Sequence, residues 1–434
     1  MAPAAALVTL PLAIRARLRE QWLSADELHA RRVARLRRLA AAAIRAPHWA
    51  EVFHRAGVRP ETLDDGPDYE RLPILEKATL KSRATQMLTQ PPDRLFRMGS
   101  SGSTGRPVMV YRSECEQAEV SALHARIHSA YGRRPLDRQV SIGSGKAAAP
   151  KGPIAMLRRA GLLPAMHRLS SFDPLDAQVE VLRRVRPDVL SGYSVAIEAL
   201  AEAVIAAGGL AVRPRLVYTG SMTRSERCHR LAQQAFGVRP LDVYATMETG
   251  PLAWECPDSP GDYHLNDDVH VLEIVDDQGR RVPDGTTGEV LITPLTCLSH
   301  PVFRYRIGDL AARRTHRCGC GRGLALLSPI AGRSNEAIRT PDGRVLNTAL
   351  LGTCFSTNED VRRWQAWQTG PNGLRIHLVV SPRWNEQSRQ AALDKLRHYL
   401  GEAIHCELVI VEDIPLAPNG KFQTIVPLDQ GTAA

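Results

Sequence analysis

The stretch S-S-G-S-T-G-R-P, Ser100 to Pro107, places four hydroxyl side chains and two glycines in its first six residues. Apolar residues before it, ending at Met98, and the V-M-V-Y after it are typical of strands. Glycines allow a tight turn in which backbone N–H groups and hydroxyls converge on an anion. The stretch therefore favours a polyphosphate-binding loop, with a plain surface turn as the alternative. It is not a Walker A loop, because Arg106 and Pro107 follow Gly105 where that motif has lysine and a hydroxyl residue.

Four further segments follow in order along the chain: Y-A-T-M-E (244–248), R-Y-R-I-G-D-L (304–310), G-R-S-N-E (332–336) and P-N-G-K (418–421). With the hydroxyl-rich loop, they resemble the adenylate-forming superfamily of acyl-CoA synthetases, adenylation domains and luciferases. The similarity is greatest to the shorter branch of phenylacetate–CoA ligase and the capsular polysaccharide biosynthesis proteins, and it runs from about residue 71 to residue 421. Each segment alone would be read as an ordinary surface or turn sequence; their order and separation make the match specific.

The resemblance implies a role for each segment in binding ATP and Mg²⁺. The hydroxyl-rich loop would hold the β- and γ-phosphates, through Ser101, Ser103, Thr104, Gly105 and Arg106. The other implied positions are Tyr244 against the adenine, Glu248 on Mg²⁺, Gly220 and Ser221 along the adenine and acyl pocket, Asp309 on both ribose hydroxyls, Arg333 at the ribose or α-phosphate, and Lys421 between the attacking carboxylate and the α-phosphate. A carboxylate suits the ribose because its two oxygens accept two O–H donors.

Two motifs depart from the family pattern. Ala245 and Met247 stand where the family has glycine and a hydroxyl residue, and a methionine cannot donate a hydrogen bond to phosphate. Asn335 and Glu336 replace two aspartates of the hinge segment. These changes leave open whether the activity is altered or reduced.

Two clusters of cysteine and histidine suggest a zinc site. Cys318 and Cys320 form a C-x-C turn, and Cys256 and His264 lie upstream. Four such ligands complete a closed tetrahedral site. Some members of this branch carry a similar set of Cys, His and C-x-C, which resembles a structural zinc site. His316 is an alternate ligand. Because no coordination position is left open, the expected role is structural. The alternative is two turns with unrelated cysteines.

Composition and pattern predict an α/β fold. A chain of 434 residues exceeds the size of one core, and the resemblance divides it into a large N-terminal domain, 1–332, and a small mobile α+β C-terminal domain, 333–434. Strands near 216–218 and 241–244 around a helix at 225–236 indicate parallel layers, the texture after residue 248 indicates an antiparallel or barrel-like portion, and a capping box at Ser24 opens a helix to about Ile44.

Charge and targeting signals limit which partners and which cellular location are expected. Residues 1–60 carry eleven arginines and four acidic residues, which fits nucleic-acid or membrane binding or a solvated helical face. Aromatic residues make up only 5% of the chain, which argues against base stacking on single strands, so no nucleic acid is expected. No apolar run reaches about 18 residues and no signal peptide is evident, so a cytoplasmic location without a membrane span is expected.

The sequence thus predicts an enzyme that uses ATP to convert a carboxylic acid to an acyl-adenylate and then transfers the acyl group to a thiol. An aryl or arylacetic acid and CoA are the substrates that the branch implies. Transfer to a carrier-protein phosphopantetheine or an amine, and a degenerate ligase retained for binding, are the alternatives. The oligomeric state stays open, although dimers are common in this branch.

Overall fold

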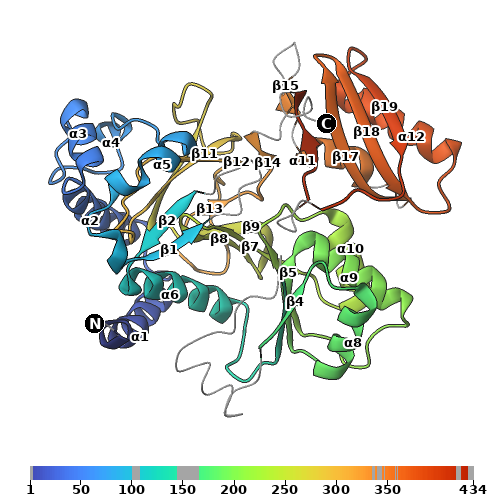
Figure 1. Ribbon diagram of the computed structural model, residues 1–434, viewed down its shortest axis with the longest axis horizontal. Coiled ribbons are helices and arrows are strands. Elements are labelled where there is room, and N and C mark those ends of the chain that lie inside the picture. Colours follow the sequence, from blue (N-terminus) through green and yellow to red (C-terminus); the bar gives the residue numbers. More distant parts are fainter. Residues whose placement is uncertain are drawn as a thin grey trace. The chain divides into compact units, whose positions relative to one another are not determined.

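The computed structural model describes residues 3–99, 108–143, 166–334, 338–339, 345–346, 348–356, 358, 360–416 and 422–428 (Figure 1). The chain divides into two compact units. Unit 1 comprises Met1–Arg134 and Leu241–Pro329, and unit 2 comprises Pro135–Pro240 and Ile330–Ala434. None of the helices in this described part combines the length and apolar character that a bilayer crossing requires.

Unit 1 begins with helices. They are α1 (Pro3–Glu20), α2 (Ala25–Ala43), α3 (Pro47–Ala56), α4 (Pro67–Glu70) and α5 (Lys77–Arg83), with 3-10 turns η1 (Ala84–Met87) and η2 (Pro92–Arg94). The predicted capping box is confirmed, because the Glu27 N–H donates to Ser24 Oγ and the Ser24 N–H donates to the Glu27 carboxylate. This exchange satisfies two donors that a helix start otherwise leaves open, and it fixes where α2 begins.

The hydroxyl-rich stretch lies between two paired strands, as predicted. Strands β1 (Phe96–Gly99) and β2 (Met109–Arg112) form an antiparallel hairpin in which Gly99 pairs with Met109. Residues 100–107 are outside the described part, but the strand ends on either side are neighbours. Helix α6 (Glu114–Ala130) follows β2 at once, and Ser113 caps it by accepting from the Glu116 N–H.

Two antiparallel sheets complete unit 1. The first has the order β13-β9-β8-β7, with β7 (Leu241–Thr246), β8 (Gly250–Cys256), β9 (Ser259–Leu265) and β13 (Leu326–Leu327). The second joins β10 (His270–Val275), β11 (Gly288–Pro294) and β12 (Tyr305–Ala311). Strands β10 and β11 match the predicted antiparallel portion, whereas the buried strands β8 and β9 were not predicted, since polar residues interrupt their apolar pattern.

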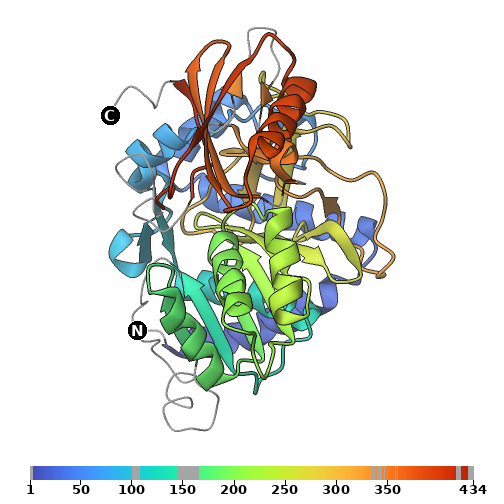
Figure 2. The same ribbon diagram turned by 90° about the vertical axis from the view of Figure 1, so that its right-hand side faces the viewer.

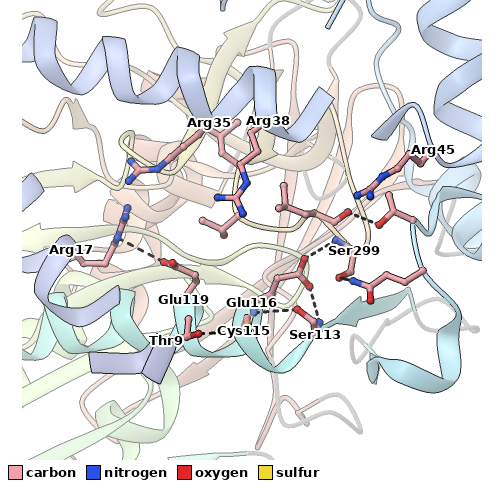
Figure 3. Close-up of a pocket in the computed structure, with 15 residues that line it drawn as sticks. Thr9, Arg17, Arg35, Arg38, Arg45, Ser113, Cys115, Glu116, Glu119 and Ser299 are labelled. Atoms are coloured by element: carbon pink, nitrogen blue, oxygen red, sulfur yellow. Dashed lines mark hydrogen bonds and ion pairs between the residues drawn. The ribbon is translucent and has the colours of Figure 1, made fainter. Parts of the chain in front are cut away.

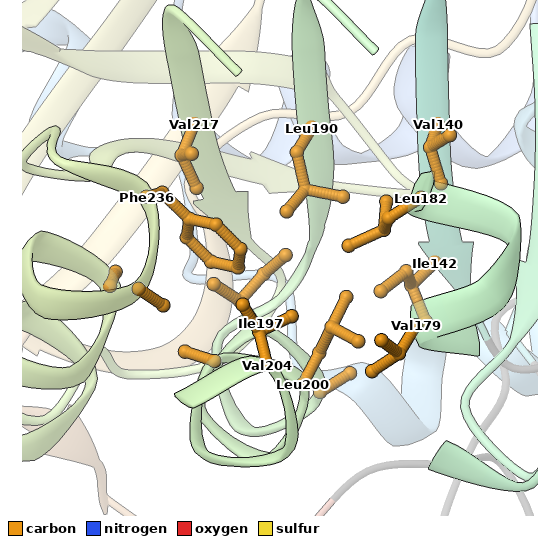
Figure 4. Close-up of a cluster of buried hydrophobic side chains, with 14 of the residues drawn as sticks. Val140, Ile142, Val179, Leu182, Leu190, Ile197, Leu200, Val204, Val217 and Phe236 are labelled. Carbon is orange, nitrogen blue, oxygen red and sulfur yellow. The ribbon is translucent and has the colours of Figure 1, made fainter. Parts of the chain in front are cut away.

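Unit 2 contains the parallel layer. Its strands run in the order β6-β5-β3-β4, namely β3 (Gln139–Gly143), β4 (Met166–Ser170), β5 (Val189–Tyr193) and β6 (Leu216–Gly220). Helices α8 (Leu175–Val185), α9 (Ser194–Ala206) and α10 (Glu226–Phe236) pack on it. Figure 4 shows Val140, Leu190 and Val217 from three strands meeting Ile197 and Phe236 from the helices. This apolar layer holds the ends of parallel strands in place.

The C-terminal part of unit 2 is α+β. It contains β14 (Gly332–Arg333), β15 (Ile338–Arg339), β16 (Val345–Leu346), α11 (Thr348–Ser356), β17 (Val361–Gly370), β18 (Gly373–Val380), α12 (Glu386–Leu400), β19 (His405–Ile410) and β20 (Ile425–Val426). Strands β19-β18-β17-β20 form a sheet against which α12 buries Ala392 and Leu396 (Figure 2). The α/β class and the small α+β part are confirmed, and the domain boundary at residue 332 stays a prediction.

The basic N-terminal segment is only partly a solvated face. Arg17 is 3% exposed and pairs with Asp268 at 2.7 Å and with Glu20 at 3.0 Å. Arg126, fully buried, donates to both oxygens of Asp268. These cations hold the pKa of Asp268 below its ordinary value against the opposing effect of burial. The arginine run therefore contributes cations to the interior of unit 1.

Candidate functional site

Two residues predicted to bind the nucleoside are in direct contact. Tyr244 lies on β7 and Asp309 on β12, 65 residues apart in the chain. The phenol of Tyr244 donates to Asp309 Oδ2 at 2.7 Å, and both residues are 8% exposed. The bond orients the carboxylate beside the aromatic ring. An aromatic face next to a fixed carboxylate suits a base with an attached ribose.

The turn after β7 carries Glu248, which is half-buried. The Tyr305 hydroxyl lies 3.5 Å from Glu248 Oε1, at the far limit of a hydrogen bond. Tyr305 belongs to the same segment as Asp309, so β12 carries one predicted carboxylate and supplies a neighbour for the other. Tyr305 had no predicted role, although its place in R-Y-R-I-G-D-L was a signal for it.

The hairpin that leads into the hydroxyl-rich stretch is tied to this turn. At the end of β2, Arg112 donates to the carbonyl oxygen of Met247 at 2.7 Å. Thr246 and Thr249 join their hydroxyls across the turn at 2.9 Å, while the Met247 side chain is 44% exposed. The turn with Glu248 is thus anchored on both sides, and the predicted phosphate loop starts from a neighbouring strand. The loop residues Ser101, Ser103, Thr104, Gly105 and Arg106 lie outside the described part.

The remaining predicted residues belong to unit 2 or are not described. Gly220 is the last residue of β6, and Ser221 follows in the left-handed region with φ of 67°. A non-glycine residue there is uncommon and marks backbone held by its surroundings. Arg333 is half-buried in β14. Lys421, Asn335 and Glu336 lie outside the described residues.

The predicted zinc ligands meet in space. The ligand atoms of Cys256, His264, Cys318 and Cys320 all lie within 4.8 Å of one another. Cys318 Sγ is 3.6 Å from Cys256 Sγ, and Cys320 Sγ is 3.2 Å from His264 Nε2. Sulfurs bound to one tetrahedral zinc ion, at about 2.3 Å each, lie about 3.8 Å apart. The donor set and spacing therefore fit zinc. The alternate ligand His316 instead contacts Asp262 at 2.8 Å.

Burial sets the protonation of this cluster. It raises the pKa of Cys256 to about 12 and lowers that of His264 to about 4, the latter helped by the charge of Arg322. Burial also favours a higher pKa for Cys320, but hydrogen bonds from Arg322 outweigh this effect, so the pKa of Cys320 is lowered. A neutral imidazole is ready to bind a metal, whereas the Cys256 thiol must lose a proton when it does so.

The turn between α1 and α2 packs over the cysteine loop. Arg322 stacks between Trp22 and Trp254, at 4.6 and 5.1 Å from the ring centroids. Its Nε donates to Gln21 Oε1 at 3.0 Å, and the Gly323 N–H donates to the Gln21 carbonyl at 3.0 Å. A side chain at position 323 would strike the Leu23 carbonyl. A metal bound to the cysteine loop would therefore also stabilise the packing of the turn between α1 and α2 against that loop.

Comparisons with known proteins agree on one group. Residues 338–427 match the family described as the CapK C-terminal domain. The chain is 26% identical over 356 residues to a phenylacetate-coenzyme A ligase of Thermus thermophilus, covering 80% of this chain and 79% of that one. It is 21% identical over 364 residues to Protein CapK of Staphylococcus aureus, covering 81% and 78%. The fold matches 2-hydroxyisobutyryl-CoA ligase in the postadenylation state in complex with R3-HIB-AMP, with a TM-score of 0.79, 20% identity and coverage of 95% and 92%.

Proposed function

We propose that the chain is an AMP-forming acid–CoA ligase of the adenylate-forming superfamily, in the branch of phenylacetate-CoA ligase and CapK, to which the comparisons show it to be similar. A carboxylic acid attacks the α-phosphorus of ATP, the bond to pyrophosphate breaks, and an acyl-adenylate forms. The thiol of CoA then attacks the acyl carbon, and AMP leaves. We propose an aryl or arylacetic acid as the substrate, following the named substrate of the phenylacetate-CoA ligase relatives.

The contact between Tyr244 and Asp309 is the observation that supports this proposal most directly. The sequence motifs assign these residues to the adenine and the ribose, and the Tyr244 hydroxyl lies 2.7 Å from Asp309 Oδ2. In the proposed complex, Tyr244 packs against the base while Asp309 accepts the ribose hydroxyls. One oxygen of Asp309 already accepts from Tyr244, and carboxylate oxygens have further lone pairs for the ribose.

The other residues act on the charge that develops during adenylation. Glu248, on its anchored turn, would hold Mg²⁺, which neutralises phosphate oxygens when bound. The hydroxyls and N–H groups of the 100–107 loop would hold the leaving pyrophosphate. Arg333 and Lys421 would place cations on the ribose or α-phosphate and between the two reacting anions. Such fixed donors are the main source of rate enhancement in phosphoryl chemistry.

We also propose that Cys256, His264, Cys318 and Cys320 bind a structural zinc ion. Three thiolates and one imidazole leave no coordination position for a substrate. The ion would join β8, β9 and the cysteine loop of unit 1. It would take no part in acyl transfer.

The acceptor and the activity itself are settled by two assays. Pyrophosphate release over a panel of aryl, arylacetic and aliphatic acids tests activation, and CoA, a phosphopantetheine carrier protein and simple amines are then compared as acceptors. We expect release with an aryl or arylacetic acid and transfer to CoA. If protein that binds ATP releases no pyrophosphate with any acid, the result would favour a degenerate ligase. The exposed Met247, in place of the expected hydroxyl residue, is the reason for retaining that alternative. Preference for a carrier or an amine would revise only the second step.

A further inference from the structure

A cavity of about 770 Å³ in unit 1 has no part in the function proposed above. It lies among α1, α2, α6 and residues 295–299, and none of the residues assigned to ATP or zinc lines it (Figure 3). Its charged lining consists of Arg17, Arg35, Arg38, Arg45, Glu116 and Glu119. Its volume is within the range of small-molecule sites, roughly 300–1,000 Å³.

The two inner arginines are already paired. Arg17 contacts Asp268 and Glu20, and Arg35 contacts the same Glu20 at 2.8 Å. Because Arg126 also binds Asp268 and Arg31 also binds Glu20, four guanidinium groups share two carboxylates. Burial lowers the pKa of Arg17, with the charge of Arg35 acting in the same direction and the neighbouring carboxylates opposing it, although a guanidinium stays charged. The inner wall thus retains an excess of positive charge.

The two glutamates of the lining offset only part of the positive charge of the four arginines. Glu116 accepts from the Ser113 N–H at 2.7 Å and the Ser299 N–H at 2.6 Å, so both of its oxygens are engaged. Glu119 approaches Arg17 Nε only to 3.8 Å, and its Oε2 has no hydrogen-bond donor among the described residues. Both carboxylates keep their negative charge, so each offsets part of the charge of the four lining arginines, and Glu119, whose Oε2 lacks a donor among the described residues, is the one whose charge is least compensated by hydrogen bonds.

Arg38 and Arg45 face the cavity from its outer part. Both are exposed, and in the described part of the chain neither forms an ion pair; Arg45 donates only to the Ala42 carbonyl, at 3.3 Å. Figure 3 shows Arg38 extending from α2 toward the cavity and Arg45 on the side of Ser299. Arginine forks match phosphate geometry with two parallel hydrogen bonds. Two such cations call for a ligand of more than one negative charge.

We propose that this cavity binds a small anion carrying phosphate groups, held by Arg38 and Arg45. A phosphate group presents up to two charges and several acceptor oxygens at neutral pH, which also suits the Thr89, Thr296 and Ser299 side chains of the lining. The phosphates come either from a free ion such as pyrophosphate or from a nucleotide. The site is separate in composition from the proposed ATP residues, so it stands or falls independently of them.

Binding of pyrophosphate and of adenosine 3′,5′-bisphosphate to the full chain tests the proposal, with affinity from calorimetry and location from hydrogen exchange. We expect protection of α2 and α6. The double variant Arg38→Ala/Arg45→Ala should weaken binding at this site on the order of tenfold. The charge-matched control Arg15→Ala/Arg19→Ala, at two exposed positions of α1 that do not line the cavity, should not. Glu119→Gln should tighten binding.

The outcomes divide clearly. Tighter binding of the bisphosphate identifies a nucleotide, and equal or tighter binding of pyrophosphate identifies a free ion; either supports the site. Protection confined to other segments, or equal affinity of the two double variants, overturns it. Citrate binding more tightly than both phosphates overturns the phosphate assignment. Loss of ATP turnover with intact protection of α2 counts against the ligase function alone.

Discussion

The Tyr244–Asp309 contact and the Cys256–His264–Cys318–Cys320 cluster are both parts of unit 1 assembled from distant segments, yet they differ in kind. The first joins two side chains by one hydrogen bond, beside a half-buried Glu248. The second brings four donor atoms within 4.8 Å of one another, which is the number that a closed tetrahedral ion requires. A site for an exchanging ligand must leave the ligand room to enter and leave, whereas the protein ligands of a structural ion fill all of its coordination positions. Perturbing each region should therefore change different measurements.

The largest effect is expected from Lys421→Ala. Removing the cation between the carboxylate and the α-phosphate should lower the rate of adenylate formation about a thousandfold, or about 4 kcal/mol. Thioester formation from supplied acyl-AMP should stay near the wild-type rate, and zinc content should not change. Pyrophosphate exchange and single-turnover thioester formation measure the two steps.

Lys81→Ala, on α5, is the control for the loss of one lysine. Pyrophosphate exchange at the wild-type rate in Lys421→Ala would refute the role of Lys421. A parallel loss of both half-reactions would instead indicate damage to the fold.

Loss of the cysteine ligands is the corresponding perturbation of the cluster. Cys318→Ser/Cys320→Ser should lower the free energy of unfolding by about 3 kcal/mol or more, because a bound ion stabilises only the folded state. The wild-type protein should contain one equivalent of zinc by metal analysis, and the variant much less. Hydrogen exchange should rise in α1 and α2, which rest on the Arg322 loop.

Cys115→Ser, at a half-buried cysteine outside the cluster, controls for loss of a thiol. Freshly purified wild-type protein with less than about half an equivalent of zinc would contradict the metal assignment. A variant as stable as wild type would leave no structural role for the ion.

The sequence predicted some contacts of these two regions and missed others. Short motifs with fixed chemistry, such as C-x-C and the segment that contains Asp309, predicted residues that the structure brings close to their expected neighbours. The sequence could not predict two of the contacts. They are the hydrogen bond from Arg112 to the Met247 carbonyl and the stacking of Arg322 between two tryptophans. Arginines at these positions look like surface residues, and their partners lie in segments joined only by the tertiary fold.

The buried strands were missed for a related reason. In β8 and β9, Glu255 and His264 are fully buried within runs that sequence patterns read as mixed. Glu255 accepts from the Gly261 N–H, and His264 approaches Cys320. Polar partners that satisfy such residues are visible only after folding.

An intermediate effect is expected at the nucleoside contact itself. Asp309→Ala should raise the KM for ATP by about 10- to 50-fold, since the two proposed ribose hydrogen bonds to a charged group would be lost. Tyr244→Phe retains the aromatic face and should raise it only a few-fold. Zinc content should be unchanged in both, which separates the two regions.

Steady-state kinetics with ATP varied at saturating acid provides the comparison. Asp276→Ala, at a turn carboxylate between β10 and β11, is the control. Equal KM values for ATP in Asp309→Ala and the control would remove Asp309 from the nucleotide site.

The smallest effect is expected at Met247, where the chain lacks the family's hydroxyl. Its carbonyl is held by Arg112 and its side chain is 44% exposed, so a smaller residue should fit without moving the turn. Met247→Thr adds a hydroxyl next to Glu248 and should raise kcat/KM for ATP about two- to fivefold, within 1 kcal/mol; Met247→Ala separates the hydroxyl from the loss of bulk. A gain in both variants would mean that the methionine obstructs the site. A loss in both variants would show that this chain uses the thioether side chain itself. Methionine at this position would then be an adaptation of the proposed ATP site. The alternative that the protein is a degenerate ligase would lose its main support.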